Sequence, residues 1–330
     1  MNKPLYLLLL GLIMASCAQQ TRMTTPSAGQ TFTSGIVKPA DYNYPTDSAF
    51  KILSWNVENF VDLLDDPYIQ NRREDNPPED TEQRISLLVQ ALRKADADVV
   101  VLQEFESVRF LKQLAQDSLS DLGYRYFEDT PSLNWYQNVV VMSRFPMGLV
   151  TGYGLATTPL PGYVNKEGNA ETQNHINSRM WSVDVFPSED YSFLLTGVHL
   201  KAGRSERDIA MRKGQLTLLT ETFNRQLAEN PHKNMVIAGD HNATPDSEEI
   251  AQLTKGKALK NRFVDTIDPS VLSHPANKPR RRLDYILINE NMKPEVLDGG
   301  AQVVHFFAPD TMRMISDHLP VVARFLKKDQ

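Results

Sequence analysis

Polar side chains of the kinds that bind metal ions and move protons recur at the carboxyl ends of apolar runs. Asn56 follows Ile-Leu-Ser-Trp, Glu104 follows Val-Val-Val-Leu-Gln, His199 follows Leu-Leu-Thr-Gly-Val, and Asp240 with Asn242 follows Met-Val-Ile-Ala-Gly. One polar residue at a strand end usually just faces solvent. Several of them, ending neighbouring strands, would converge at one edge of a sheet, where α/β proteins place their sites. The pattern therefore predicts one polar pocket.

The strands that must position these residues are short and rich in β-branched residues. We expect them at 51–57, 99–103, 139–143, 181–185, 193–199, 235–239, 284–288 and 321–325. Helices are expected at 81–95 and 209–227, the first because apolar residues recur there every three to four positions. Loops are expected at 62–83, 152–177 and 270–282, where Pro, Gly, Asn or charged residues gather. Two sets of strands with helices outside them predict an α/β layered sandwich.

The composition excludes a purely electrostatic nucleic-acid coat. The 330 residues are 41% apolar, enough for a substantial core, and 35 basic against 41 acidic residues give a net charge of −6. Phosphate binding would have to come from local patches. Two basic segments flank the expected pocket: one follows His199 (Lys201, Arg204, Arg207, Arg212, Lys213) and one precedes Asp284 (Lys278, Arg280, Arg281, Arg282). Charge runs are most often solvated faces, and the acidic stretch 62–82 would repel DNA from part of the rim.

The N-terminus reads as an export signal. A short positive segment, an apolar run from Leu5 to Met14 and two small residues precede Cys17, the single cysteine, which excludes an intrachain disulfide. Residues 1–16 are thus expected to be a lipoprotein signal peptide, 17–48 the lipid-anchor site and a flexible tether, and 49–330 the catalytic domain. Small residues directly before a cysteine resemble the bacterial lipoprotein signal, which prefers Leu where Met14 stands. Anchoring at Cys17 in the outer membrane is expected, with periplasmic location or ordinary secretion as the alternative.

Seven segments together resemble the endonuclease/exonuclease/phosphatase superfamily. They occur in the family's order over roughly residues 50–326: Ser54-Trp-Asn-Val-Glu-Asn-Phe60, Leu102-Gln-Glu104, Val141-Met-Ser-Arg-Phe-Pro146, Val198-His-Leu200, Gly239-Asp-His-Asn242, Arg282-Leu-Asp-Tyr285 and Ser316-Asp-His-Leu-Pro320. This superfamily includes deoxyribonuclease I, exonuclease III-type repair nucleases, neutral sphingomyelinases and inositol polyphosphate 5-phosphatases. The resemblance implies a four-layered α/β sandwich of two packed mixed β-sheets flanked by helices. It also implies a divalent cation, usually Mg²⁺, with Mn²⁺ as a substitute.

The resemblance assigns roles that suit the residue types. Glu104 would hold the magnesium ion, with Asn56 and Asp317 as further ligands. His318 would sit against the phosphate, oriented by Asp284. Either His318 or Asp240 would take the proton of the attacking water, and the sequence leaves that choice open.

The other site candidates contact the substrate or the water. Asn242 would orient the nucleophile or donate to a non-bridging oxygen. His199 resembles the histidine of the deoxyribonuclease I, sphingomyelinase and phosphatase branches, which assists the leaving group or binds phosphate. Arg179 occupies the place of a phosphate-contacting arginine, with a plain surface arginine as the alternative, and Lys201 shares the face of His199. His241 replaces an apolar or aromatic residue and is expected to point away from the site, as a packing difference rather than a second base, with an extra metal ligand as the alternative.

These expectations lead to a magnesium-dependent phosphodiesterase, an exported nuclease acting on DNA or RNA. The alternatives are a phosphoesterase on sphingomyelin-type lipids or inositol phosphates, and a binding protein without catalysis. A binding protein without catalysis should have lost some of the residues that carry the reaction. Glu104, Asp240, Asn242, Asp284 and His318 are all present. The expected partners are nucleic acid as substrate and a membrane through the lipid anchor, with no protein partner and a monomeric state.

Overall fold

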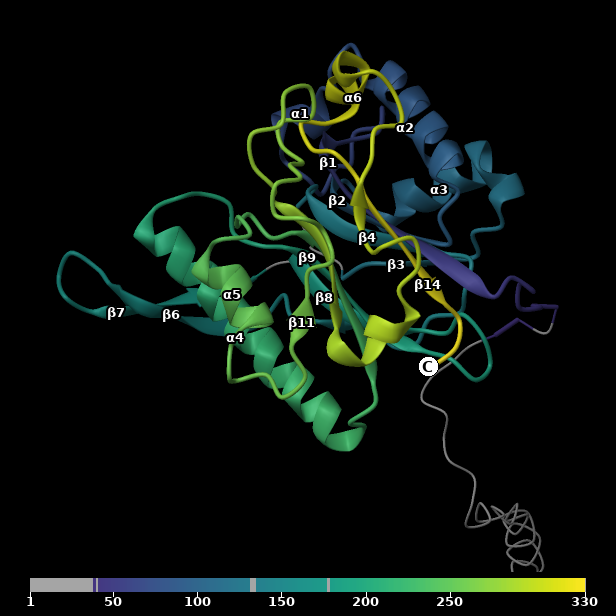
Figure 1. The fold of residues 1–330 in the computed structure, drawn as a ribbon. Coiled ribbons are helices and arrows are strands. Elements are labelled where there is room, and N and C mark those ends of the chain that lie inside the picture. Colours follow the sequence, from purple (N-terminus) through teal and green to yellow (C-terminus); the bar gives the residue numbers. More distant parts are fainter. Residues whose placement is uncertain (1–37, 40, 131–134, 177–178, 330) are drawn as a thin grey trace, which may run out of the picture. The chain divides into compact units, whose positions relative to one another are not determined.

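The computed structural model describes residues 38–39, 41–130, 135–176 and 179–329 (Figure 1). The expected signal peptide, Cys17 and most of the expected tether lie outside these described residues. Among the helices that are described, none is long and apolar enough to cross a membrane.

The first mixed sheet has six strands in the order β13-β14-β1-β2-β4-β3. Its strands are β1 (Ala49–Phe60), β2 (Val99–Phe105), β3 (Tyr126–Glu128), β4 (Asn138–Ser143), β13 (Gln302–Val303) and β14 (Val321–Leu326). β1 and β2 run parallel, whereas β14 and β4 flank them antiparallel. The parallel pair brings Asn56 and Glu104 to the same edge of the sheet.

The second mixed sheet also has six strands, in the order β11-β12-β10-β9-β8-β5. Its strands are β5 (Thr151–Gly152), β8 (Met180–Val185), β9 (Phe193–His199), β10 (Asn234–Asp240), β11 (Phe263–Val264) and β12 (Asp284–Asn289). The register pairs Asp240 of β10 with His199 of β9 on one side and with Asp284 of β12 on the other. Three of the expected site residues are therefore neighbours across adjacent strands.

The two sheets pack face to face through an apolar core. Side chains alternate along each strand, so Ile52 enters the core between the sheets and Leu53 enters the one beneath the helices. Phe50 of the first sheet stacks on Phe193 of the second with ring centroids 5.1 Å apart. The indole N–H of Trp181 donates across the interface to the carbonyl of Val139 at 2.7 Å. This packing fixes the height of one sheet against the other.

Helices cover the outer face of each sheet, which completes four layers (Figure 1). α2 (Thr81–Ala95), α3 (Val108–Ser118) and α6 (Pro309–Ile315) pack on the first sheet, and α4 (Glu206–Glu229) and α5 (Glu248–Thr254) on the second. The short helices α1 (Arg72–Asp75), η1 (Ser120–Leu122) and η3 (Glu290–Glu295) lie in connections. The predicted four-layered sandwich of two mixed sheets is confirmed. The eight predicted strands and both predicted helices also occur, with ends shifted by a few residues at most.

The stretch 152–177, predicted as a loop, instead contains a hairpin. β6 (Thr157–Val164) and β7 (Ala170–Asn174) form a separate two-stranded sheet beside α4 (Figure 1). A Cβ on Gly214 of α4 would lie 2.1 Å from the carbonyl oxygen of Pro159, so this helix glycine permits the hairpin to approach. The hairpin was missed because its Pro and Gly content masks a strand pattern whose apolar face is completed only by α4. The predicted loop at 62–83 likewise contains α1 and the first turn of α2.

Glu295, which contacts Asn234 at the start of β10, makes stability depend on pH. Its buried carboxylate accepts hydrogen bonds from Tyr191 and Asn234. Burial raises its pKa from 4.5 to about 7. Between these values the folded protein retains a proton that the unfolded chain releases, so stability falls as pH rises through this window. Glu295→Gln has no proton to release at this position, so we expect it to lose less stability than wild type as the pH rises. The free energy of unfolding of the variant minus that of wild type should increase by about 1–3 kcal/mol from pH 4.5 to pH 8. Urea unfolding of both proteins at both pH values measures these free energies. An equal difference between variant and wild type at the two pH values would contradict the prediction.

Candidate active site

Asp240 is the centre of the polar pocket. It is 1% exposed at the end of β10. Its Oδ2 accepts a hydrogen bond from Asn56 Nδ2 at 3.0 Å and lies 3.8 Å from both His199 Nε2 and His318 Nε2. Its Oδ1 accepts from the backbone N–H of Asn242 at 2.8 Å. Three of the side chains predicted from the sequence, and the backbone of a fourth predicted residue, thus meet on one carboxylate.

Glu104 lies beside Asp240 and offers a hard oxygen donor set. Asn56 Nδ2 donates to Glu104 Oε1 at 3.2 Å as well as to Asp240, so a single amide bridges two carboxylates. Glu104 Oε2 accepts from Asn59 N at 2.9 Å and from Gln137 Nε2 at 3.0 Å. Two adjoining carboxylates and one amide are the ligand types that a divalent cation such as Mg²⁺ takes. The donor set therefore fits the metal ion that the sequence led us to expect.

His318 is held by a carboxylate on one ring nitrogen and faces the pocket with the other. Its Nδ1 lies 2.9 Å from Asp284 Oδ2, which also accepts from Ser273 Oγ at 2.6 Å. Its backbone carbonyl accepts from the Trp55 indole at 2.8 Å, which ties the turn to β1. Burial opposes the imidazolium, but Asp284, Asp240 and Asp317 outweigh burial and raise the pKa of His318 to about 10. His318 is therefore a cation at neutral pH.

His199, in contrast to His318, is uncharged at neutral pH. Burial lowers its pKa to about 4, and the nearby cations Arg179, His318 and Lys201 add to this effect against the attraction of Asp240. Its Nε2 lies 3.7 Å from Glu104 Oε1. Its Nδ1 is buried without a hydrogen-bond partner among the described residues. The pocket thus holds one neutral and one protonated imidazole, both directed at Asp240.

The backbone is strained where these side chains gather. Glu104 has φ +57° and Asn242 has φ +49°, a left-handed conformation that few non-glycine residues adopt. Gly239, directly before Asp240, has φ +150°, and a Cβ there would lie 1.9 Å from the carbonyl oxygen of Val198. Such strain persists only where surrounding contacts enforce it, and here it occurs at two of the predicted site residues.

Three further predicted residues lie nearby with differing contacts. Arg179 faces the two carboxylates: burial lowers the pKa of its guanidinium, and Glu104 and Asp240 oppose that shift. Lys201 Nζ pairs with Asp208 at 3.0 Å, which neutralises its charge. Asp317 contacts His274 and lies 3.7 Å from His318 Nε2, whereas Asn56 contacts Glu104 directly. The structure thus joins two of the three predicted metal ligands, Asn56 and Glu104, and places the third, Asp317, beside His274 and His318.

His274 is a pocket residue that sequence reasoning missed. Its Nε2 lies 3.1 Å from Asp317 Oδ2, its Nδ1 accepts from Arg281 Nε at 3.2 Å, and its ring packs edge-on to His318 with centroids 4.6 Å apart. The ligand atoms of His274, Asp317 and His318 all lie within 4.8 Å of one another. His274 belongs to the predicted loop 270–282 and follows no apolar run, so no local signal marked it.

Glu58 and Gln137 were also missed. Glu58 accepts from the backbone N–H of Asp317 at 3.0 Å, and Gln137 donates to Glu104 as described above. Glu58 lies within the first of the seven motifs, so the motif itself was the available signal. His241, by contrast, behaves as expected: it is fully buried and packs edge-on to Tyr285 with centroids 4.9 Å apart.

Comparisons with known proteins agree with the fold and the motifs. A family model described as "Endonuclease/Exonuclease/phosphatase family" matches residues 53–318. A comparison with curated protein sequences finds no match.

Several solved structures share the fold. The human Nocturnin catalytic domain with bound sulfate anion aligns with TM-score 0.54 and 18% identity over 85% of this chain and 95% of that one. TDP2 of D. rerio complexed with single strand DNA product aligns with TM-score 0.54 and 20% identity, over 84% and 99%. An endonuclease/exonuclease/phosphatase from Bacteroides vulgatus aligns with TM-score 0.53 and 14% identity, over 86% and 100%. At these identities the similarity concerns the fold alone.

The protonated state of His318 can be tested without any activity. We expect Asp284→Asn to lower the pKa of His318 well below its value near 10, because the neutral amide no longer stabilises the imidazolium. The cation should then be lost at a lower pH than in wild type. Histidine ring resonances followed by NMR from pH 5 to 11 in metal-free protein measure this. Exposed His232 is the internal reference, and an unchanged His318 titration would contradict the assignment.

Proposed function

The chain belongs to the endonuclease/exonuclease/phosphatase family and is a hydrolase of phosphoester bonds, and we propose that it is a magnesium-dependent phosphodiesterase that cleaves nucleic acid outside the cytoplasm. The observation that carries this proposal is the convergence of two imidazoles on Asp240 Oδ2, 3.8 Å from each, beside the Glu104 carboxylate. A general base, a cation for developing phosphoryl charge and a metal ligand then lie within one pocket.

Glu104 and Asn56 would hold the magnesium ion, with Asp317 as the outer candidate. When bound, the ion would supply positive charge next to the phosphoryl oxygens. Asn56 contributes through its amide, which keeps the carboxylates of Glu104 and Asp240 at the same place. Gln137 and the backbone of Asn59 fix the other oxygen of Glu104. These contacts orient the Glu104 carboxylate, the proposed metal ligand, before substrate arrives.

Asp240 is the proposed general base and His318 the electrostatic partner. A pKa near 10 leaves His318 protonated at neutral pH, so it cannot accept the proton of water, whereas the Asp240 carboxylate can. The imidazolium N–H at Nε2 would instead donate to a phosphoryl oxygen. Asn242, whose backbone N–H orients Asp240, would position the water or donate to a non-bridging oxygen. This choice follows from Asp284, which supplies the charge that stabilises His318.

His199 and Arg179 are proposed to bind the phosphoryl group from the other side. A neutral His199 can donate one N–H from Nε2 toward the pocket without adding charge. Arg179 faces the same carboxylates and stays charged because an arginine pKa far exceeds physiological pH. Together they would neutralise the leaving oxygen and hold the phosphate in line with the water.

A nucleic-acid strand is the proposed substrate, and the protein is proposed to act as a monomer. Two basic segments border the pocket on the chain, and a structural neighbour was solved with a single-strand DNA product. Export through the N-terminal signal and a lipid anchor at Cys17 would place this activity in the cell envelope. Lipid and inositol phosphoesters are the competing substrates, and the assay below separates them.

Hydrolysis should require magnesium and the residues of the pocket. We expect wild-type protein to degrade plasmid DNA or RNA in magnesium or manganese, with no release of phosphocholine from sphingomyelin or of phosphate from inositol phosphates. His318→Ala and Glu104→Ala should each lower kcat by about 10²- to 10⁴-fold, because they remove the cation and the metal ligand. His305→Ala, which removes an exposed histidine, is the matched control. Full activity in either pocket variant would refute the mechanism, and cleavage of lipid instead of nucleic acid would refute the substrate.

The lipid anchor predicts a membrane location that depends on one thiol. In an exporting bacterial host, wild-type protein should sediment with membranes and incorporate labelled palmitate. Cys17→Ser should be released to the soluble fraction, since acyl chains rather than a spanning helix provide the attachment. Soluble wild-type protein that has lost residues 1–16 would leave export intact and reject the anchor.

A further inference from the structure

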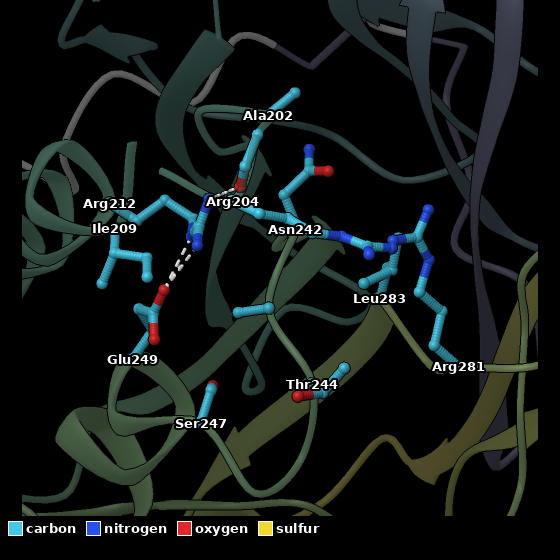
Figure 2. Close-up of a pocket in the computed structure, with 12 residues that line it drawn as sticks. Ala202, Arg204, Ile209, Arg212, Asn242, Thr244, Ser247, Glu249, Arg281 and Leu283 are labelled. Carbon is cyan, nitrogen blue, oxygen red and sulfur yellow. Dashed lines mark hydrogen bonds and ion pairs between the residues drawn. The ribbon is translucent and has the colours of Figure 1, made fainter. Parts of the chain in front are cut away.

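A cavity of about 490 Å³ adjoins the active site at Asn242 (Figure 2). Its walls come from the connection between β9 and α4, from the start of α4, and from the segments that follow β10 and precede β12. The residues that line it include Arg204, Arg212, Glu249, Arg281 and Leu283. Asn242 separates this cavity from Asp240 and donates a backbone hydrogen bond to that carboxylate. A ligand in the cavity would therefore lie one side chain away from the proposed general base.

Ion pairing selects which basic residues remain available at the pocket. Five of the nine cations in the two basic segments have carboxylate partners, namely Lys201 with Asp208, Arg207 with Glu171, Arg212 with Glu249, Lys213 with Glu248 and Arg282 with Asp265. Within the described part of the chain, no carboxylate lies within ion-pair distance of Arg204, Lys278, Arg280 or Arg281. Of these four, only Arg204 and Arg281 line the cavity.

Other contacts position the backbone next to Arg204 and the guanidinium of Arg281. Arg212 is 4% exposed, pairs with Glu249 and donates to the carbonyls of Lys201 and Gly203 at 2.9 and 2.8 Å, which fixes the backbone just before Arg204 (Figure 2). Arg281 donates from Nε to His274 at 3.2 Å. That contact leaves both terminal nitrogens of Arg281 without an acceptor among the described residues. A guanidinium oriented in this way is prepared for two-point binding of an anion.

The two charges act on each other across the cavity. Burial lowers the pKa of Arg281, the positive charge of Arg204 lowers it further, and Asp240 and Asp317 oppose both effects. In Figure 2 the two side chains extend toward the same side of Asn242. Two like charges facing one space without a carboxylate between them are stabilised when an anion enters.

We propose that Arg204 and Arg281 form a subsite for a second phosphate of the substrate, the one that flanks the scissile phosphate along a nucleic-acid strand. This inference rests on the proposed function, since Asn242 is shared by both sites. A planar guanidinium pair matches phosphate oxygens. It repels the positive headgroup of a choline lipid, so the subsite favours a polynucleotide over that alternative.

The test compares three substrates with one phosphodiester bond each: the dinucleotide d(TpT) and the same molecule with a further 5′- or 3′-phosphate. Wild type should cleave one phosphorylated form with at least about tenfold higher kcat/KM than d(TpT), because charge-assisted hydrogen bonds to the added phosphate are worth more than about 1.4 kcal/mol. In Arg204→Gln and Arg281→Gln the preference should fall toward one. Arg204→Lys should restore part of it, since it keeps the charge but not the two-point geometry.

The control is Arg280→Gln, which removes an exposed arginine that does not line the cavity and should leave the preference unchanged. No preference in wild type, or an undiminished preference in the Arg204 and Arg281 variants, would overturn the subsite.

A binding measurement separates failure of the subsite from failure of the proposed function. Fluorescence anisotropy with a labelled ten-residue oligothymidylate in EDTA needs no cleavage. The slope of log Kd against log salt should fall by about one for each arginine removed. If no oligonucleotide is cleaved but the slope falls, the nuclease proposal fails while Arg204 and Arg281 are still shown to bind phosphate. If cleavage occurs and the slope is the same in all variants, the nuclease proposal stands and the subsite fails.

Discussion

The hydrogen bond from Asn56 Nδ2 to Asp240 Oδ2, 3.0 Å long, joins strands that belong to different sheets. Both side chains are 1% exposed, and a carboxylate buried to that extent is costly without such donors. The bond forms only if Asn56 of β1 and the end of β10 lie at the same height. Their height is set by the apolar packing between the sheets, including the Phe50–Phe193 stack and the hydrogen bond from Trp181 to Val139. The polar pocket thus depends on the hydrophobic core beneath it.

β1 also positions residues of the C-terminal part of the chain. The Trp55 indole donates to the carbonyl of His318, and Ser316 Oγ donates to the carbonyl of Asn56 at 2.6 Å. These bonds hold the turn between α6 and β14 over the end of β1, so His318 faces Asp240 although 78 positions separate them in the sequence. A disturbance of β1 would therefore move the proposed metal ligand Asn56 and the His318 ring together.

Charge state in the pocket is decided by neighbours rather than by residue type. His199 and His318 lie at the same distance from Asp240 Oδ2, yet their pKa values shift in opposite directions. The difference is Asp284, which contacts His318 but not His199 and which, together with Asp240 and Asp317, outweighs the cost of burial at His318. One histidine can then act as a cation and the other as a neutral donor, which divides the work on a phosphoryl group between them.

The sequence by itself determined the sandwich and most of the pocket, because the pattern of each strand and the polar residue that follows it are short segments of the chain. Near-continuous apolar runs specify strands with two buried faces, and Asn56, Glu104, His199 and Asp240 each directly follow one. Only the tertiary structure decided which charges remain available and how they are oriented. Arg212 and Arg282 find their carboxylates 37 and 17 positions away, and His274 meets Asp317 43 positions away. Such partners depend on packing between distant segments, and no local pattern encodes them.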